Sequence, residues 1–375
     1  MLNFAIIGVG RMGKIHAANL YNHVIPGARL QAVCDNDPTV LSQCETCFPT
    51  VHRYLDYHDL LTKEKLDGVL IATPHYSHGE IAKFFISHHL ATLIEKPLAV
   101  TAKEAQSVME VAKANPDTLA CLAFNQRSNR VYQAMKEIVD KGELGTIRSA
   151  RFEISDWYRC DSYYRTNPWR ASYGQEGGGC LINQCAHQLD LIIWILGLPT
   201  KVWGNCQTIG RNISCENEAL AILTYPTFRL VFTASCHDAS GINCFEVSGD
   251  KGRVTATKEI LTVRLHDDDS VINHACQTDK PLVRYVKRKT HYGTSIGEAD
   301  KRYGQQHRCL FSFRDAILGR DKPLASLEDG LKEDQLLNAI YYSSWTGKEV
   351  SVPVDPDTYE KALKAKIAEE EKTRR

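Results

Sequence analysis

The chain lacks the features that would direct it to a membrane, to nucleic acid or to secretion. Its 45 basic residues are balanced by 45 acidic ones, so no net charge attracts it to a polyanion. No apolar run approaches the roughly 20 residues of a membrane-spanning helix, and the N-terminus shows no leader pattern. We therefore expect a cytoplasmic protein with a small-molecule substrate, and neither nucleic acid nor a membrane as its partner.

The chain also lacks a cysteine pattern typical of disulfides or zinc sites. Its thirteen cysteines are scattered, most of them in apolar runs where a thiol behaves as a small hydrophobic side chain. Cys44 and Cys47 have no second pair, and His266 with the three aspartates after it fits a turn better than a set of metal ligands. We predict reduced thiols and no metal.

The N-terminal part of the chain contains the pattern of a strand, a glycine turn and a helix. An apolar run leads into Gly8-Val9-Gly10-Arg11-Met12-Gly13, and a helical pattern follows. Such glycines permit a tight turn and close approach of a pyrophosphate, whose charge the helix N-terminus attracts. The next strand, 29–34, ends in Asp35, where a carboxylate would bind the ribose hydroxyls of NAD and repel the 2′-phosphate of NADP. The alternative for Asp35 is a helix cap.

Strands continue to alternate with helices up to residue 125, which predicts a doubly wound, parallel Rossmann sheet. Ligands bind at the carboxyl ends of the strands in such a sheet. We favour a catalytic or substrate-anchoring role for Lys96, which follows one strand end, over a solvated surface lysine. The residues predicted to contact the cofactor are Gly8, Gly10, Arg11, Met12, Gly13, Asp35, Thr73, Pro74, His75, His78, Glu95, Lys96 and Asn125.

After residue 126 the pattern changes to a series of strands separated by turn signals. These strands predict an α+β domain with a large, mostly antiparallel open sheet and a helix, 127–142, across one face. A second subunit would cover the other face, which predicts a homodimer or homotetramer. The expected strands are 146–154, 200–208, 218–225, 228–235, 242–247 and 252–265.

This pattern divides the chain into three parts. We assign 1–125 to an NAD-binding Rossmann domain and 126–358 to a domain for substrate binding and oligomerisation. The last helices of the second part have apolar faces and are expected to pack back on the first domain. Residues 359–375 are predicted to form a charged, exposed helical tail.

A polar stripe follows the three glycines at 177–179. One helix is predicted from these glycines to about Ile195, and Asn183, His187 and Asp190 then stand at i, i+4 and i+7 on one face. An amide, an imidazole and a carboxylate beside an apolar face predict a substrate pocket in which His187 titrates.

The stretch 157–175 is rich in aromatic residues and arginine, which suit the faces and hydroxyls of sugars. A packing loop is an equally good interpretation. We predict that substrate contacts Lys96, Tyr158, Tyr164, Trp169, Arg170, Asn183 and His187. The basic segment around Lys287–Lys289 could meet an acidic substrate, although a solvated loop is more typical of such a run.

Over essentially its full length the chain resembles the Gfo/Idh/MocA family of NAD(P)-dependent oxidoreductases. The resemblance is carried by the glycine motif at 8–13, by Thr73-Pro74 with His78, by Glu95-Lys96-Pro97, and by the glycine-rich stretch that ends in His187 and Asp190. It implies a Rossmann domain joined to an α/β domain with an open sheet, and Lys96 and His187 on either side of the nicotinamide. The family usually has an aspartate, which acts with the histidine in proton transfer, where this chain has Asn183.

These observations predict hydride transfer between NAD and a ring hydroxyl or ketone of a sugar, glycoside or polyol such as an inositol. His187 would act as the general acid or base, since an unperturbed imidazole with a pKa of about 6.5 can take the hydroxyl proton. Lys96 would stabilise the reacting oxygen, and Asn183 would orient a neighbouring hydroxyl. Two alternatives remain: a redox-neutral glycosidase that retains NAD and acts by transient oxidation and elimination, and a non-catalytic NAD-binding sensor.

Overall fold

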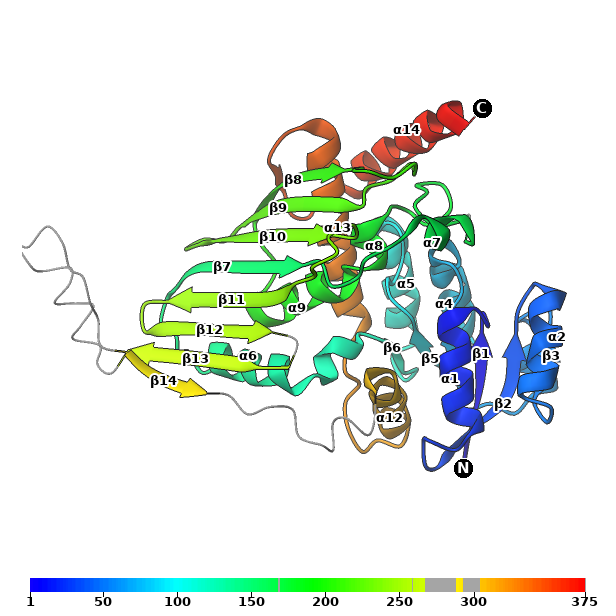
Figure 1. The fold of residues 1–375 in the computed structure, drawn as a ribbon. Coiled ribbons are helices and arrows are strands. Elements are labelled where there is room, and N and C mark those ends of the chain that lie inside the picture. Colours follow the sequence, from blue (N-terminus) through cyan, green and yellow to red (C-terminus); the bar gives the residue numbers. More distant parts are fainter. Residues whose placement is uncertain (168, 258, 267–287, 293–303, 375) are drawn as a thin grey trace, which may run out of the picture.

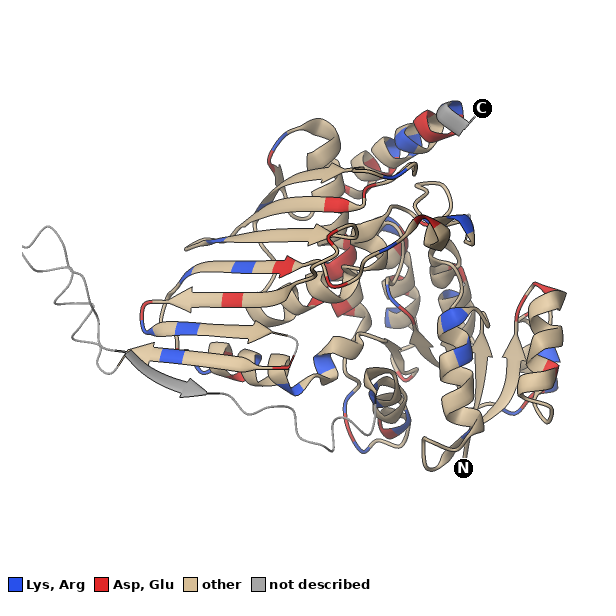
Figure 2. Ribbon diagram, in the orientation of Figure 1, with Lys and Arg blue, Asp and Glu red and all other residues tan. Residues whose placement is uncertain are grey.

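The computed structural model describes residues 1–167, 169–257, 259–266, 288–292 and 304–374, which form two sheets with helices packed between and around them (Figure 1). One sheet has six strands in the order β3-β2-β1-β4-β5-β6, and the other has nine in the order β14-β13-β12-β11-β7-β10-β9-β8-β15. Charged residues of both signs are scattered over the helices, the loops and the strands of the nine-stranded sheet (Figure 2). In the described residues, no helix is long and apolar enough to cross a membrane.

The six-stranded sheet is parallel throughout, which confirms the predicted Rossmann architecture. Its strand order reverses between β1 and β4, and ligands of doubly wound sheets bind at that switch point. The short edge strand β3 escaped prediction because three residues carry little pattern. The strands are β1 (Leu2–Ile7), β2 (Ala28–Cys34), β3 (His52–Tyr54), β4 (Gly68–Ile71), β5 (Ala91–Ile94) and β6 (Ala120–Leu122).

Both faces of this sheet are buried, because alternate residues of each strand enter two different cores. Ala5 and Ile7 of β1 join one core with α4 and α5, whereas Phe4 and Ile6 join another with α1 and α2. Helix α12 also covers the second face, and its Phe313 ring stacks on Phe4 with 5.4 Å between centroids. The helices here are α1 (Arg11–Tyr21), α2 (Pro38–Cys47), α3 (Asp59–Lys63), η1 (His75–Ser77), α4 (His78–Ser87), α5 (Ala102–Ala114) and α12 (Gln305–Ile317).

In the nine-stranded sheet every neighbouring pair is antiparallel except β7 and β10, as the predicted open sheet requires. The prediction of one strand over 252–265 was wrong, because this segment folds into the hairpin β12–β13. No glycine or proline marks its turn, although the buried positions change there from even numbers (Val254, Ala256) to odd numbers (Leu261, Val263). The strands are β7 (Ile147–Ile154), β8 (Lys201–Gln207), β9 (Glu218–Thr224), β10 (Arg229–Ser235), β11 (Asn243–Gly249), β12 (Gly252–Thr257), β13 (Leu261–His266), β14 (Arg288–Tyr292) and β15 (Val350–Ser351).

One face of this sheet packs on helices to form the largest core. Phe152 and Phe245 stack there with 4.5 Å between centroids, and residues of α9 and α13 fill the space above them. The predicted helix over 127–142 is divided between a short turn, η2, and α6. The remaining helices are η2 (Asn125–Ser128), α6 (Arg130–Asp140), α7 (Asp161–Arg165), α8 (Cys180–Asn183), α9 (Ala186–Leu196), α13 (Leu327–Thr346) and α14 (Pro356–Arg374).

The predicted single helix after the three glycines is in fact two helices, α8 and α9, that meet at Gln184 and Cys185. The N–H of Cys185 lies 3.1 Å from the carbonyl oxygens of both Cys180 and Leu181. The bond to Cys180 spans five residues instead of four, and such a turn widens and interrupts a regular helix. Asn183 and His187 therefore do not share one regular helix face.

The C-terminal tail is helical, as predicted, but the expectation that it is exposed was wrong. Tyr359 of α14 is only 1% exposed, and Leu363 and Ile367 lie on the same side, four residues apart. The Tyr359 ring stacks on Trp345 with 5.5 Å between centroids. The many charges of this segment concealed a narrow apolar stripe that packs against α13.

Candidate active site

The glycine turn between β1 and α1 is shaped to admit a ligand. A Cβ on Gly8, whose φ is +83°, would lie 2.7 Å from the backbone of Ala72 and Thr73, and one on Gly13 would lie 1.9 Å from the Gly8 oxygen. A Cβ on Gly10 would meet nothing within 4 Å. Gly10 is also the N-cap of α1 and provides no side chain to cap it. Thus two glycines permit close packing, while the third leaves room beside an open helix N-terminus, as a pyrophosphate requires.

Asp35 lies at the end of β2 beside this turn. Its carboxylate accepts hydrogen bonds from the N–H groups of Val9, at 2.7 Å, and Asp37, at 3.0 Å. The helix-cap interpretation of Asp35 is wrong, because Asp37 caps α2 by accepting from the N–H of Thr39. Asp35 therefore holds the glycine turn against the end of β2.

Two predicted cofactor residues, His75 and His78, are buried and bonded to the backbone. His75 Nδ1 lies 2.9 Å from the carbonyl oxygen of Glu176 and donates to it, and burial lowers the pKa of His75 well below its usual value. The ring of His78 lies between the carbonyl oxygens of Pro97, at 2.7 Å, and Thr73, at 2.8 Å. The His78 ring thereby joins the segment after β4, which contains Thr73 and Pro74, to the segment after β5, which contains Pro97.

Glu95 is paired with a histidine of the first helix and not with the ammonium of the neighbouring Lys96. Its Oε1 lies 2.8 Å from His16 Nε2 of α1, and both side chains are buried. Burial by itself would raise the pKa of Glu95, but the hydrogen bond and charge of His16, with Lys96, hold it below its usual value. Glu95 thus ties β5 to α1 from within the protein.

Lys96 connects the six-stranded sheet to the second half of the chain. Its Nζ donates a hydrogen bond to the carbonyl oxygen of Asn183, the last residue of α8. Burial lowers the pKa of Lys96, while the negative charges of Glu95 and Glu176 oppose this effect. The contact brings together residues 87 positions apart in the sequence, two of the three predicted catalytic residues.

The third, His187, lies at the start of α9 with its ring edge-on to Phe124, 6.2 Å between centroids. Its Nδ1 is buried and has no hydrogen-bond partner among the described residues. Burial and the charge of Lys96 lower the pKa of His187 to about 3. The prediction that His187 titrates near its ordinary pKa was therefore wrong, since this site keeps the imidazole neutral.

Asp190, the third member of the predicted polar stripe, does not line a pocket with Asn183 and His187. It is fully buried and accepts hydrogen bonds from Arg127 at 2.6 and 2.9 Å. Arg127 also lies 3.1 Å from Asp329. Burial raises the pKa of Asp190 to about 6 even though Arg127 opposes the shift. This ion pair network joins η2, α9 and α13 beneath the site.

The sequence pattern did not reveal Glu176, although it directly precedes the three glycines. Its carboxylate accepts hydrogen bonds from the side-chain amide of Asn183 and, at 2.5 Å, from the N–H of Ala171. Arg170 Nη1 lies 3.4 Å from the same carboxylate. The only sign of Glu176 in the sequence was a charged residue beside three glycines. Its hydrogen-bond partners could not be identified before the folded structure was known.

The aromatic stretch contributes only some of its predicted residues. Trp169 approaches the His75 ring edge-on at 5.9 Å, and the Arg170 guanidinium lies 4.5 Å from the Trp169 ring centroid. Tyr163, which we did not select, lies under Arg170 at 4.6 Å and accepts a hydrogen bond from Gln184 at 3.0 Å.

The two selected tyrosines lie elsewhere. Tyr158 is 49% exposed and bonds to Arg211, and Tyr164 packs against the large core. Tyr158 precedes the short helix α7 and Tyr164 lies within it. Their contact with substrate stays a prediction.

The remaining predicted residues occupy the expected strand ends or fall outside the description. Arg11 and Met12 begin α1, and Asn125 follows β6 with its Oδ1 unpartnered among the described residues. The basic segment around Lys287–Lys289 lies outside the residues whose side chains the structure describes.

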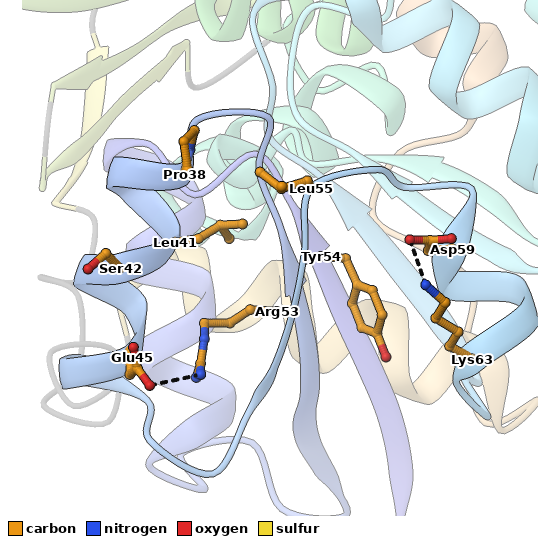
Figure 3. A pocket seen from close by; sticks show the side chains of 9 residues that line it. All are labelled: Pro38, Leu41, Ser42, Glu45, Arg53, Tyr54, Leu55, Asp59 and Lys63. Atoms are coloured by element: carbon orange, nitrogen blue, oxygen red, sulfur yellow. Dashed lines mark hydrogen bonds and ion pairs between the residues drawn. The ribbon is translucent and has the colours of Figure 1, made fainter.

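A surface hollow of about 470 Å³ lies at the β3 edge, between α2 and α3 (Figure 3). Arg53 faces Glu45 at 3.2 Å, and Lys63 faces Asp59 at 2.9 Å. The hollow contains none of the predicted site residues, and its charges are paired.

The glycine geometry predicts opposite effects for two alanine substitutions. Gly10→Ala should leave the melting temperature unchanged but weaken NAD binding about tenfold or more, because its methyl group occupies only the space open to a ligand. Gly13→Ala should lower stability by about 1–3 kcal/mol, because its methyl group collides with the Gly8 carbonyl. Thermal melts and calorimetric NAD titrations would check both, and unaltered NAD binding by Gly10→Ala would contradict the assignment.

Comparison with known proteins agrees with this geometry. Residues 2–122 match the model described as oxidoreductase family, NAD-binding Rossmann fold, and residues 132–255 match the GFO/IDH/MocA C-terminal domain. The chain is 24% identical to the uncharacterized oxidoreductase YrbE of Bacillus subtilis, over 92% of this chain and 95% of that protein. It is 30% identical to inositol 2-dehydrogenase of Salmonella typhimurium, but over only 38% of this chain and 43% of that enzyme.

Among solved structures, the fold is similar to the WlbA dehydrogenase from Bordetella pertussis in complex with NADH and UDP-GlcNAcA. The TM-score is 0.76 at 20% identity, over 94% of this chain and 99% of that one. The two family models follow one another along the chain and correspond to its two sheets. The chain therefore belongs to the Gfo/Idh/MocA family of oxidoreductases, and its N-terminal part is an NAD-binding Rossmann domain.

Proposed function

We propose that the protein is an NAD-dependent dehydrogenase that acts on a ring hydroxyl of a sugar, glycoside or polyol. The observation that carries this proposal is the contact between Lys96 and Asn183. It brings a lysine at the edge of the NAD-binding sheet to the end of α8, next to α9, which carries His187. Trp169, Arg170 and Tyr163 adjoin this place and suit a hydroxylated ring. The similarity to an inositol 2-dehydrogenase supports the same substrate class.

Bound NAD supplies the acceptor for a hydride from the substrate carbon. The residues of this chain must then remove the hydroxyl proton and stabilise the charge that develops on the oxygen. The imidazole of His187 is neutral at physiological pH, so its unprotonated ring nitrogen has a lone pair that can accept the proton. Its low pKa reflects burial and the nearby Lys96 charge, and negative charge on a substrate oxygen between them would offset the effect of Lys96. Lys96 stabilises that oxygen by hydrogen bonding.

A screen for NAD reduction over inositols, free sugars and glycosides, with product analysis, tests the proposal. A ketone product formed together with NADH would support a dehydrogenase. Glycoside cleavage without net NADH would instead indicate the NAD-retaining glycosidase. Binding of NAD without turnover of any compound would indicate the sensor.

Replacing His187 by alanine should lower turnover about 100-fold or more without changing NAD affinity, because a general base contributes that much to proton transfer. The pH profile of kcat/KM in the wild type should show no histidine ionisation between pH 6 and 7. Since the depressed pKa of His187 is about 3, its protonation should reduce activity only well below pH 5.

The exposed His58, replaced by alanine, is the control and should retain full turnover. Wild-type activity of His187→Ala would contradict the catalytic role of His187. An acid limb near pH 6.5 that disappears in this variant would contradict the lowering of its pKa by burial.

We propose further that Asp35 binds the adenosine ribose. Asp35→Ala should then weaken NAD far more than NADP, because only NADP carries a phosphate that the carboxylate repels. Asp35 also holds Val9 of the glycine turn, and loss of that support would weaken both cofactors equally. Titrations of the variant with each cofactor separate the two roles, and an equal loss would reject the ribose contact.

We propose that the outer face of the nine-stranded sheet forms the interface of a homo-oligomer. Leu220 of β9 and Val231 of β10 are 36% and 39% exposed on that face, and large apolar side chains on an uncovered sheet favour association. Val231→Lys should reduce the molar mass measured by light scattering, whereas Ile209→Lys, an equally exposed apolar residue outside the strands, should not. A monomeric wild type would refute the interface.

A further inference from the structure

Glu176 lies at the centre of a set of contacts that the proposed reaction does not yet use. It is 1% exposed and lies in the loop that leads into the three glycines. One carboxylate oxygen accepts from the side-chain amide of Asn183, and the other accepts from the N–H of Ala171 at 2.5 Å. An ionised carboxylate can only accept hydrogen bonds, so the NH₂ group of Asn183 must be the end that faces it.

The other end of the Asn183 amide is also held. Its Oδ1 accepts a hydrogen bond from Gln184 Nε2 at 3.2 Å, and the same nitrogen lies 3.0 Å from the Tyr163 hydroxyl. Because Glu176 takes the donor end and Gln184 takes the acceptor end, the amide has one orientation. Without Glu176, only the hydrogen bond from Gln184 would oppose the flipped form of the amide.

Asn183 also links Glu176 to Lys96. Its backbone carbonyl accepts from the lysine ammonium, while its side chain donates to the glutamate. Burial raises the pKa of Glu176, but the hydrogen bonds from Asn183 and Ala171 and the positive charges of Arg170, 3.4 Å away, and Lys96 oppose that shift and favour the ionised form. The negative charge of Glu176 in turn opposes the lowering of the Lys96 pKa by burial. The anion, the amide and the cation thus form one connected unit across the α8 terminus.

We propose that Glu176 is a positioning residue of the active site, which sets the orientation of the Asn183 amide and supplies the anion that faces Lys96. This inference rests on the proposed dehydrogenase function in assigning Lys96 and Asn183 to the reaction. Glu176 itself acts through these two residues and not on the substrate.

The first test is Glu176→Gln, which keeps the size of the side chain but removes its charge. Turnover should fall about 10- to 100-fold, the range for loss of a hydrogen bond to a buried charged group. The alkaline limb of kcat should also move to lower pH, because Lys96 loses an anion that favours its charged form.

The matched control is Glu370→Gln. Glu370 is another buried carboxylate that accepts a loop N–H, that of Tyr173 at 2.8 Å, but it extends from α14. This variant should lower the melting temperature without moving the alkaline limb. An equal shift of the limb in both variants would show a general effect of loop loosening and would overturn the proposal.

A reciprocal exchange tests the amide–carboxylate pair directly. Asn183→Asp alone places two carboxylates in contact, so one must take a proton and activity should recover as the pH falls. The double variant E176Q/N183D restores one amide and one carboxylate in reversed order. It should regain at least about tenfold over E176Q, while a double variant no better than either single variant would overturn the pairing. The double variant also serves if E176Q fails to fold.

Labelling of Lys96 gives a measurement that needs no substrate. The rate of its acetylation by acetic anhydride as a function of pH, followed by mass spectrometry, reports the ionisation of the amine. The apparent pKa should fall in E176Q and stay unchanged in E370Q. An unchanged value in E176Q overturns the inference even if the wild type is active. A fall in E176Q together with an inactive wild type supports the control of Lys96 by Glu176 and refutes the proposed reaction instead.

Discussion

The site depends on one constraint: a lysine ammonium that is buried between two halves of the chain must find acceptors and anions there. Desolvation of an unpaired charge is costly, so the surrounding structure has to supply partners. Asn183 supplies a carbonyl, and Glu95 and Glu176 supply negative charge. These partners come from the end of β5, from the loop before α8 and from α8 itself. The contacts that stabilise the buried Lys96 charge therefore also position the NAD-binding sheet against the second part of the chain.

A second network of buried ion pairs stabilises the contact between the two parts of the chain. Arg127 of η2 is bonded to Asp190 of α9 and Asp329 of α13, so that one guanidinium joins three elements that are distant in sequence. Removing one partner of such a network typically costs about 3–5 kcal/mol, since the other charges stay buried. The polar residues near His187 thus divide into two groups. Asn183 belongs to the site, whereas Asp190 supports the helix that carries His187.

Several predictions from local pattern were correct because the pattern itself contains the cause. Buried parallel strands have continuous apolar sequences. Close backbone approach requires glycine at 8 and 13, and glycine at 10 leaves an open space beside the helix. The errors arose where a local pattern has more than one solution. The turn within 252–265 contains neither glycine nor proline, so nothing in its composition separated two strands. The α8–α9 break left no mark at Gln184 and Cys185, and the stripe of Tyr359, Leu363 and Ile367 was hidden among charges.

The sequence by itself determined the architecture, the glycine turn for NAD and the identity of Lys96, Asn183 and His187 as the residues to consider. Tertiary structure alone decided what each of them can do. It assigned Glu95 to His16, Asp190 to Arg127 and Glu176 to Asn183, and it lowered the pKa of His187 to about 3. The physical reason is that periodicity and turn chemistry are local, whereas desolvation and charge pairing depend on residues that folding brings together from far apart in the chain.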